Sequence, residues 1–368
     1  MSEHFRLHVL PAGIGDALVL EYGTDDATSR VVIDGGVGKT APVLAEFLGP
    51  TPDLELMVVT HIDNDHIQGA LAMLEKRLVE PAIGDVWFNG FRHLPESPLE
   101  SMGPVEGERL TSLIVDRGLP WNAHRTFNGH AVAVTDPTHP PVAVLPGGLS
   151  CTVLSPGPAQ LQALRPKWLP AVQEANLDPA ALLPEEELPP PGRLERMGAP
   201  DLDALAAQKT PVDTTEANGS SIALLAAWAG RRALLAGDAH PDVLLAALDA
   251  WLGPDATLDV DLFKLPHHGS KANVTNALIA RVRARCYVFS SSGEGRSQHP
   301  NDQAVARVIV NSTGERTLAF NYRNPRTQVW DDATLKDERG YATCYPDTPG
   351  ACAPDAGHGG LTIDLLAL

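Results

Sequence analysis

The stretch LELMVVTHIDNDHIQG, residues 54–69, joins an apolar segment to a dense group of polar side chains. Residues 54–60 are almost wholly apolar, which is typical of a β-strand that is buried on both faces. A helical pattern begins at about Ile67. Because an apolar strand, a polar loop and a helix follow one another, the sequence predicts an α/β fold. Four side chains that can bind metal ions lie within the six residues of the loop: His61, Asp63, Asp65 and His66.

These four side chains have the chemistry and the spacing of metal ligands. Imidazole nitrogens and carboxylate oxygens bind borderline-to-hard divalent ions. Alternation along an extended loop places His61, Asp63 and Asp65 on one side, and His66 turns in from the start of the helix. A polar loop in which an aspartate caps the helix is the simpler interpretation. Four ligand-type side chains at this spacing favour a metal site instead.

Two further polar clusters follow apolar strands. Asp238 comes directly after the run LLA and Gly237, and His267 and His268 follow the predicted strand Leu258–Leu265. Taken singly, Asp238 is equally compatible with a turn, and the histidines with structural roles. All three clusters lie at the carboxyl ends of strands, which meet at one rim of an α/β fold, where ligands bind. Their concurrence predicts one shared site.

The composition excludes several other classes of protein. The 368 residues include 46 acidic and 28 basic side chains, which gives a formal net charge of −18. This charge argues against a sequence-independent nucleic-acid coat, because such binding depends on neutralising phosphates. It remains compatible with a nuclease whose metal ions supply positive charge locally.

We expect a cytoplasmic protein that does not bind a membrane. No apolar run is long enough to span a bilayer, and the N-terminus lacks a secretory signal. Four cysteines are too few for a disulfide scaffold in a chain of this size.

Residues 165–215 differ in character from the rest of the chain. This segment is proline-rich and acidic, and its three consecutive prolines exclude a continuous helix or a central strand there. Strand-like segments resume after it. We therefore expect a surface insertion within a single domain of residues 1–368, and not a linker between two domains.

Seven motifs of the chain, in their order, resemble those of a known family. The loop HIDNDH is similar to the H-x-H-x-D-H signature of the metallo-β-lactamase fold superfamily, with aspartate at the second position. Together with GIGDALVLEY, VVIDGG, NGSSIALL, LLAGD, LPHHGS and QHP, it resembles the soluble, DNase-like hydrolase domain of ComEC proteins over residues 13–300. The resemblance implies a four-layered αββα sandwich with a metal site at one edge of its two sheets.

The resemblance also implies a binuclear site for divalent ions, Zn²⁺ or Mn²⁺. His61 and Asp63 match ligands of the first ion. Asp65 and His66 match ligands of the second ion, and Asp238 matches the carboxylate that bridges both.

One histidine of the adjacent pair matches the remaining ligand of the second ion. The sequence leaves open whether it is His267 or His268, with a slight preference for His267. The superfamily's third histidine for the first ion is absent, because the matching segment is Asn218–Ser221. We therefore expect the first site to bind more weakly and to tolerate Mn²⁺ or Mg²⁺. Three other side chains are expected to support the ligands from behind: Asp34, Ser221 and Lys271.

The expected reaction is hydrolysis by a water molecule that two metal ions activate. Asp65 is expected to be both a ligand and a proton acceptor, and His299 to contact a phosphate or to donate a proton. The expected substrate is a phosphodiester, nucleic acid included, and the oligomeric state is left open. A polymer would need basic side chains at the site, for which five are candidates: Arg92, Lys264, Lys271, Arg296 and Arg326.

Two alternatives belong to other classes. The first is a small-molecule hydrolase that acts on a lactone, a thioester or a small phosphodiester, since one fold can host all of these activities. The second is a non-catalytic binding protein on the same fold.

Overall fold

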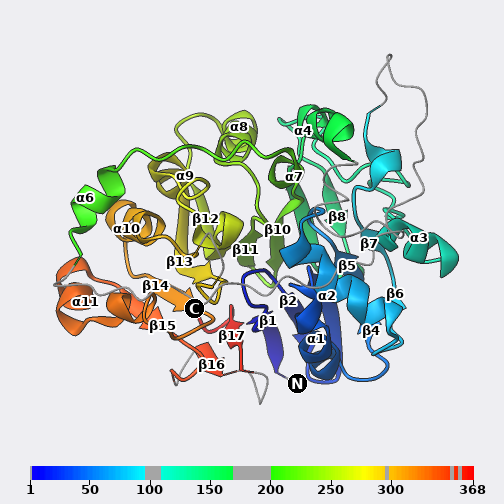
Figure 1. The fold of residues 1–368 in the computed structure, drawn as a ribbon, viewed down its shortest axis with the longest axis horizontal. Helices are drawn as coiled ribbons and strands as arrows, with labels where there is room; N and C mark the ends of the chain where they lie inside the picture. The colour runs from blue at the N-terminus through cyan, green and yellow to red at the C-terminus, as the bar shows by residue number, and fades with distance from the viewer. Residues whose placement is uncertain (1, 96–108, 169–199, 295–297, 349–351, 355–358) are drawn as a thin grey trace.

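The computed structural model describes residues 2–95, 109–168, 200–294, 298–348, 352–354 and 359–368 (Figure 1). They form a mixed α/β structure with three β-sheets, so the predicted α/β class is confirmed. Most of the predicted insertion, residues 169–199, lies outside the described residues, as does Arg296. None of the helices in the described ranges combines the length and the apolarity that a membrane crossing requires.

The first large sheet has the strand order β16-β17-β1-β2-β3-β5-β7. Strands β1, β2 and β3 are antiparallel neighbours, whereas β3, β5 and β7 run parallel, so their carboxyl ends lie at one edge. The strands are β1 (Glu3–Val9), β2 (Leu18–Thr24), β3 (Ala27–Ile33), β5 (Leu56–Val58), β7 (Val86–Trp87), β16 (Cys352–Pro354) and β17 (Leu361–Asp364).

The second large sheet has the strand order β15-β14-β13-β12-β11-β10-β9-β8. Strands β11 to β15 are parallel, and their carboxyl ends share an edge in the same way. The strands are β8 (Val142–Val144), β9 (Ser150–Ser155), β10 (Ala223–Trp228), β11 (Arg231–Leu235), β12 (Leu258–Lys264), β13 (Val282–Phe289), β14 (Thr317–Phe320) and β15 (Ala342–Cys344). A small third sheet pairs β4 (Asp53–Leu54) with β6 (Ala82–Ile83).

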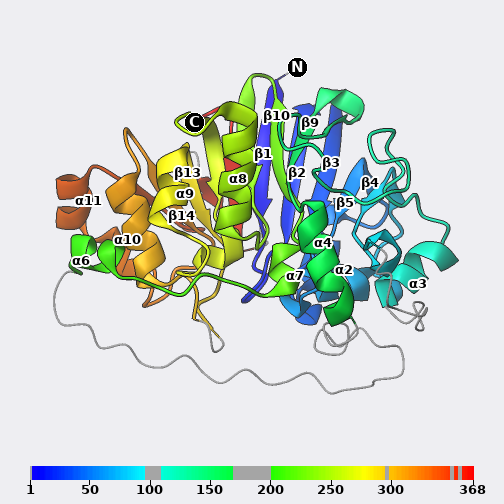
Figure 2. The same cartoon turned by 90° about the horizontal axis from the view of Figure 1, so that it is seen from above.

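Three apolar clusters account for the packing of these elements. One cluster joins the two large sheets, for example through Leu20 of β2 and Leu224 of β10. Their chain neighbours Val19 and Leu225 belong to two other clusters, because successive side chains of a strand point to opposite faces. These two clusters also contain residues of the helices, and Figure 2 shows α8, α9 and α10 along the second sheet.

The helices lie on the faces of the sheets that do not face each other. The first sheet packs against α1 (Ala41–Leu48), α2 (Asn64–Glu75), α3 (Arg109–Asp116) and α4 (Pro158–Leu164). The second packs against α6 (Leu202–Ala207), α8 (Pro241–Leu252), α9 (Asn276–Arg281), α10 (Asp302–Asn311) and α11 (Ala333–Arg339). The short helix α7 (Glu216–Gly219) precedes β10.

The predicted elements differ from the observed ones mainly at their ends. The helix expected from about Ile67 begins at Asn64, because Asp63 takes the extended backbone of an N-cap residue. Helix α9 ends at Arg281, since residues from Val282 onward pair with β12. The strand expected over 54–60 is divided between β4 and β5, which pair in different sheets.

Candidate metal centre

The loop between β5 and α2 is held in place by two close backbone contacts. Gly35 N–H donates to the His66 carbonyl at 2.7 Å, and Asp16 N–H donates to the Asp65 carbonyl at 3.1 Å. A Cβ atom at Gly15 would lie 1.7 Å from the Asp65 carbonyl oxygen, so only glycine permits this approach. The turn between β1 and β2 therefore fixes the backbone of the ligand loop.

Asp34, at the carboxyl end of β3, orients both histidines of this loop. Its Oδ2 lies 2.7 Å from His66 Nδ1, and the backbone N–H and the hydroxyl of Thr60 each donate to its carboxylate at 2.8 Å. Thr60 Oγ1 lies 2.9 Å from His61 Nδ1. Because that hydroxyl donates to Asp34, it accepts from His61 Nδ1–H. Both imidazoles thus keep their proton on Nδ1 and present Nε2 to the site, as metal-ligating histidines do.

Four buried side chains from four different segments could hold a metal ion: Asp16, His66, Asp238 and His268. His66 Nε2 lies 3.1 Å from His268 Nε2 and 3.3 Å from Asp238 Oδ1. Asp65 Oδ2 lies 3.4 Å from His268 Nε2. Donor atoms bound at about 2.1 Å to one tetrahedral ion are about 3.4 Å apart, so these separations match a shared ion.

The hydrogen bonds of the two facing histidines also fit a metal ion. His268 Nδ1 lies 3.3 Å from Asp16 Oδ1, just as His66 Nδ1 lies beside Asp34. When each Nδ1–H points at a carboxylate, the two Nε2 lone pairs face each other. Lone pairs at 3.1 Å repel unless a proton or a metal ion lies between them. The donor set therefore fits a divalent ion on chemical grounds.

Lys264, at the end of β12, is fully buried and forms an ion pair with Asp16. Although burial raises it, Lys264 and His268 together hold the pKa of the Asp16 carboxyl well below its usual range. Because the ammonium lies inside the protein, it cannot contact a polymeric substrate. Lys264 is therefore not one of the basic side chains that could face a polymeric substrate.

Further donors lie near Oδ2 of Asp238, which comes three residues after the end of β11. Asp238 Oδ2 is 3.7 Å from both His267 Nε2 and His268 Nε2, and 4.0 Å from His61 Nε2. His61 Nε2 also lies 3.6 Å from Asp63 Oδ2. This nitrogen is buried and has no hydrogen-bond partner within the described ranges. The residues expected to hold two ions thus lie around one carboxylate.

The adjacent histidines point in different directions. Both have a left-handed backbone, with φ of 49° at His267 and 55° at His268, and their ring planes are 80° apart. His268 lies with His66 and Asp65, the donors expected for a second ion, whereas the preference from sequence was for His267. The physical reason is the left-handed turn, which sends successive side chains in directions that an extended or helical pattern does not produce.

The charges of this cluster shift the ionisation of its members. Although burial favours the neutral imidazole, Asp238 and Asp34 raise the pKa of His66 well above its usual value. Against the same effect of burial, Asp238 and Asp16 raise the pKa of His268 to about 9. Burial favours the neutral carboxyl of Asp238, but the imidazoles of His66 and His268 hold its pKa well below the usual value. A metal ion that binds here must displace protons from imidazoles.

His299 lies beside the cluster, and neither of its ring nitrogens has a hydrogen-bond partner among the residues that the structure describes. The side chain is buried, and its ring centroid is 4.9 Å from that of His267 and 6.3 Å from that of His268. Burial and the charges of these two imidazoles lower the pKa of His299 to about 3. It is therefore neutral near pH 7 and suits a hydrogen bond to a substrate better than proton donation.

The remaining predicted residues lie in different surroundings. Ser221 Oγ accepts the backbone N–H of Asp238 at 3.2 Å, so this hydroxyl supports the metal-ligand turn. Lys271 is exposed, and its backbone forms hydrogen bonds with the side chains of Asn301 and Thr210. Arg92 stacks over a tryptophan ring, and Arg326 donates to a glutamine side chain at 3.0 Å.

Two residues that contact the candidate ligands, Asp16 and Asp213, had no predicted role. Asp16 lies within the motif GIGDALVLEY, so that motif was a usable signal. Asp213 lies in the segment 165–215, which contains many acidic residues, so nothing in the sequence distinguishes it from the others. Its carboxylate accepts hydrogen bonds from Asn218 Nδ2 at 2.6 Å and Asn273 Nδ2 at 3.0 Å.

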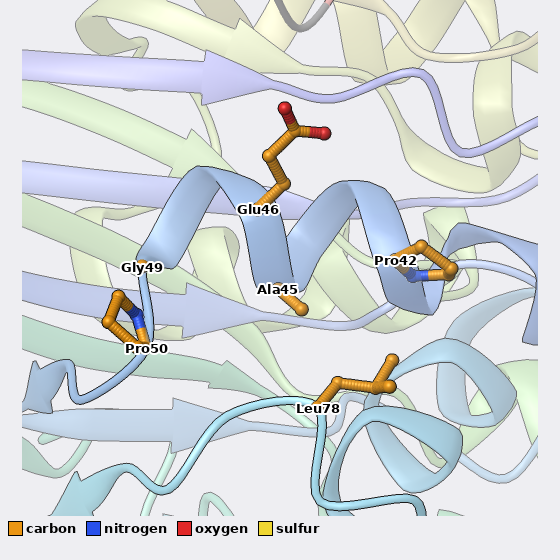
Figure 3. A pocket seen from close by; sticks show the side chains of 6 residues that line it. All are labelled: Pro42, Ala45, Glu46, Gly49, Pro50 and Leu78. Carbon is orange, nitrogen blue, oxygen red and sulfur yellow. The ribbon is translucent and has the colours of Figure 1, made fainter.

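A shallow hollow elsewhere on the surface has no part in this centre. It is lined by Pro42, Ala45, Glu46, Gly49, Pro50 and Leu78, along α1 and the turn after it (Figure 3). None of the candidate ligands lines it, and Glu46 is its one ionisable side chain.

Comparison with models of known protein families and with curated proteins gives no match for this chain. The function is therefore argued from the geometry and the chemistry of the centre itself.

Proposed function

We propose that this protein is a metal-dependent hydrolase of the metallo-β-lactamase superfamily, with a four-layered αββα sandwich as a single domain. The observation that carries the proposal is the convergence of Asp63, Asp65 and four imidazoles around Asp238. Their donor atoms are separated by 3.1–4.0 Å, as the ligands of neighbouring ions would be. The apolar cluster between the two large sheets, with helices on their other faces, supports the proposed architecture.

Two divalent ions are the proposed cofactor, and Asp238 is the proposed bridging ligand. His61 and Asp63 would hold the first ion, and Asp65, His66 and His268 the second. Bound ions of this kind supply electrophilic activation of a phosphoryl group and of an attacking water molecule. Asp34 and Asp16 would keep His66 and His268 in the tautomer that offers Nε2.

His299 is the proposed contact to the substrate. A neutral imidazole without a protein partner can donate one N–H to an oxygen of a phosphodiester. Because the pKa of His299 is lowered to about 3, we propose that it binds and orients the substrate and that the leaving oxygen takes its proton from solvent.

A phosphodiester is the proposed substrate, since a paired-ion site suits an in-line displacement at phosphorus. A small-molecule hydrolase is the second candidate, and the burial of Lys264 favours it. That burial removes one of the cations that a nucleic acid would need near the site, in a chain with a net charge of −18.

The proposal is tested by assaying the purified protein, with Mn²⁺ or Zn²⁺, on bis(p-nitrophenyl) phosphate, single-stranded DNA and a panel of lactones. We expect phosphodiester cleavage that Asp65→Ala abolishes and His299→Gln weakens mainly through KM. Asp136→Asn is the matched control, because Asp136 is an exposed aspartate that contacts His139. Cleavage of lactones alone would support the second candidate, and no metal-dependent hydrolysis of any of them would refute the proposal.

A further inference from the structure

The first metal ion lacks the superfamily's third histidine, yet the structure provides another imidazole beside Asp238. His267 Nε2 lies 3.7 Å from Asp238 Oδ2, the same oxygen that lies 4.0 Å from His61 Nε2. His268 Nε2 is equally close to this oxygen, but it also lies 3.1 Å from His66 Nε2 and 3.4 Å from Asp65 Oδ2, among the donors of the second ion. His61 Nε2 lies 3.6 Å from Asp63 Oδ2. His61, Asp63, Asp238 and His267 thus offer two nitrogens and two oxygens, the number of donors that a tetrahedral site uses.

The hydrogen bonds of His267 leave its Nε2 available for a metal ion. His267 Nδ1 lies 3.0 Å from Asn273 Oδ1 and 3.3 Å from both Asp213 Oδ2 and Asn218 Nδ2. The amide of Asn218 makes its shorter hydrogen bond to Asp213, at 2.6 Å, so the two oxygens favour a proton on Nδ1 and a lone pair on Nε2. A carboxylate behind Nδ1 is the arrangement that orients metal-ligating histidines.

Asp213 is itself held rigidly in the position that orients His267. Its Oδ1 accepts the backbone N–H and the hydroxyl of Thr215 at 3.0 Å and 2.8 Å. Its Oδ2 accepts Asn218 Nδ2 at 2.6 Å and Asn273 Nδ2 at 3.0 Å. Asn218 begins the segment Asn218–Ser221, in which the family's third histidine is absent. Asn218, in the segment that lacks the family's histidine, thus helps to hold Asp213 beside His267.

We propose that His267 completes the protein ligands of the first ion, with His61, Asp63 and the bridging Asp238, and that Asp213 is its positioning residue. This inference rests on the proposed function, because it requires metal binding at the centre. It changes the expectation for the first ion, because its site would then contain two imidazoles instead of one. Such a site favours Zn²⁺ over Mg²⁺ and binds it more tightly than a site with a single imidazole.

The test is a metal titration of the full chain, with Co²⁺ as a spectroscopic probe and Zn²⁺ measured by competition with a chelator. His267→Gly is the main variant, because glycine adopts the φ of 49° without strain and leaves space for an imidazole molecule. Asp213→Asn tests the positioning residue, and His268→Ala is the mirror variant for the second ion. Asp136→Asn is the matched control, since Asp136 Oδ2 lies 3.1 Å from His139 Nδ1 in an exposed pair.

We expect the unmodified chain to bind two ions with separate Co²⁺ absorption bands. His267→Gly should weaken one ion by at least about 100-fold and leave the other within about threefold, and added imidazole should restore its band. Asp213→Asn should weaken the same ion by about 10–100-fold, the usual effect of removing a carboxylate behind a histidine ligand. Asp136→Asn should change neither ion.

The outcomes separate this inference from the proposed function. If the unmodified chain binds no divalent ion, both fail. If it binds two ions and His267→Gly retains both affinities, or loses the ion that His268→Ala also loses, the inference fails and the proposed function stands. Near-UV circular dichroism shows whether each variant is folded, and imidazole rescue distinguishes a lost ligand from a distorted site.

Discussion

Replacing Asp34 with asparagine tests whether the carboxylate behind His66 controls metal binding. The carboxylate is 1% exposed and receives three hydrogen bonds, from Thr60 N, Thr60 Oγ1 and His66 Nδ1. In Asp34→Asn the Oδ1 acceptor for Thr60 N is retained. The new amide N–H₂ faces two groups that previously donated to the carboxylate, so His66 loses its anionic acceptor and the preference for a proton on Nδ1.

The magnitude follows from the lost contacts. Removing a carboxylate partner of a metal-binding histidine costs about 10–100-fold in metal affinity, which corresponds to about 1.4–2.8 kcal/mol. The loss should fall on the second ion, because His66 Nε2 lies among the donors of that ion. The free energy of unfolding of the metal-free protein should fall by about 1–3 kcal/mol, since buried donors lose their acceptor.

The assay is a Zn²⁺ competition titration with a chromophoric chelator, accompanied by urea unfolding of the metal-free protein. Asp85→Asn is the matched control. Asp85 is also buried, and its carboxylate accepts hydrogen bonds from Trp87 Nε1 at 2.9 Å and from the backbone of Ala123 and His124. It should destabilise the fold without changing metal affinity. Equal affinities in Asp34→Asn and the unmodified protein would refute the role assigned to Asp34.

Three further predictions concern stability and are checked by urea unfolding of the metal-free protein. Lys264→Met should lower the free energy of unfolding by about 3–5 kcal/mol, because it leaves Asp16 buried without its cation. Gly35→Ala should cost at least about 3 kcal/mol, since its Cβ would lie 2.0 Å from the backbone nitrogen of Ala70. Glu21→Gln should be most destabilising at neutral pH, and its difference from the unmodified protein should shrink as the pH falls from about 4.5 toward about 2.

The pH prediction has a definite sign. Burial raises the pKa of Glu21, but hydrogen bonds from His8 and Arg30 lower it to about 2, below the usual value of 4.5. The unfolded chain therefore binds the proton more readily, and the contribution of Glu21 to stability is lost as the pH falls through this window. A difference that does not depend on pH would contradict the assignment.

For the Gly35→Ala prediction, Gly118→Asn is the control, because nothing lies within 4 Å of a Cβ there.

The sequence by itself determined the α/β class and the segments that carry the candidate ligands. The alternation of apolar side chains and the runs of buried strands follow from the period of a strand, which is a local property. His61, Asp63, Asp65 and His66 are likewise close in space because the covalent chain keeps them close. That Asp238 joins them could be anticipated, since parallel strands end at a common edge.

Only the tertiary structure decided which partner each of these groups has. The left-handed backbone of His267 and His268 sends one imidazole to His66 and the other to Asp213, although most non-glycine residues avoid that conformation. Lys264 follows an apolar strand as a surface lysine could, but the fold buries it against Asp16, more than 200 residues away in the chain. Burial and pairing over such distances depend on how the two sheets pack, and no local spacing of residues encodes them.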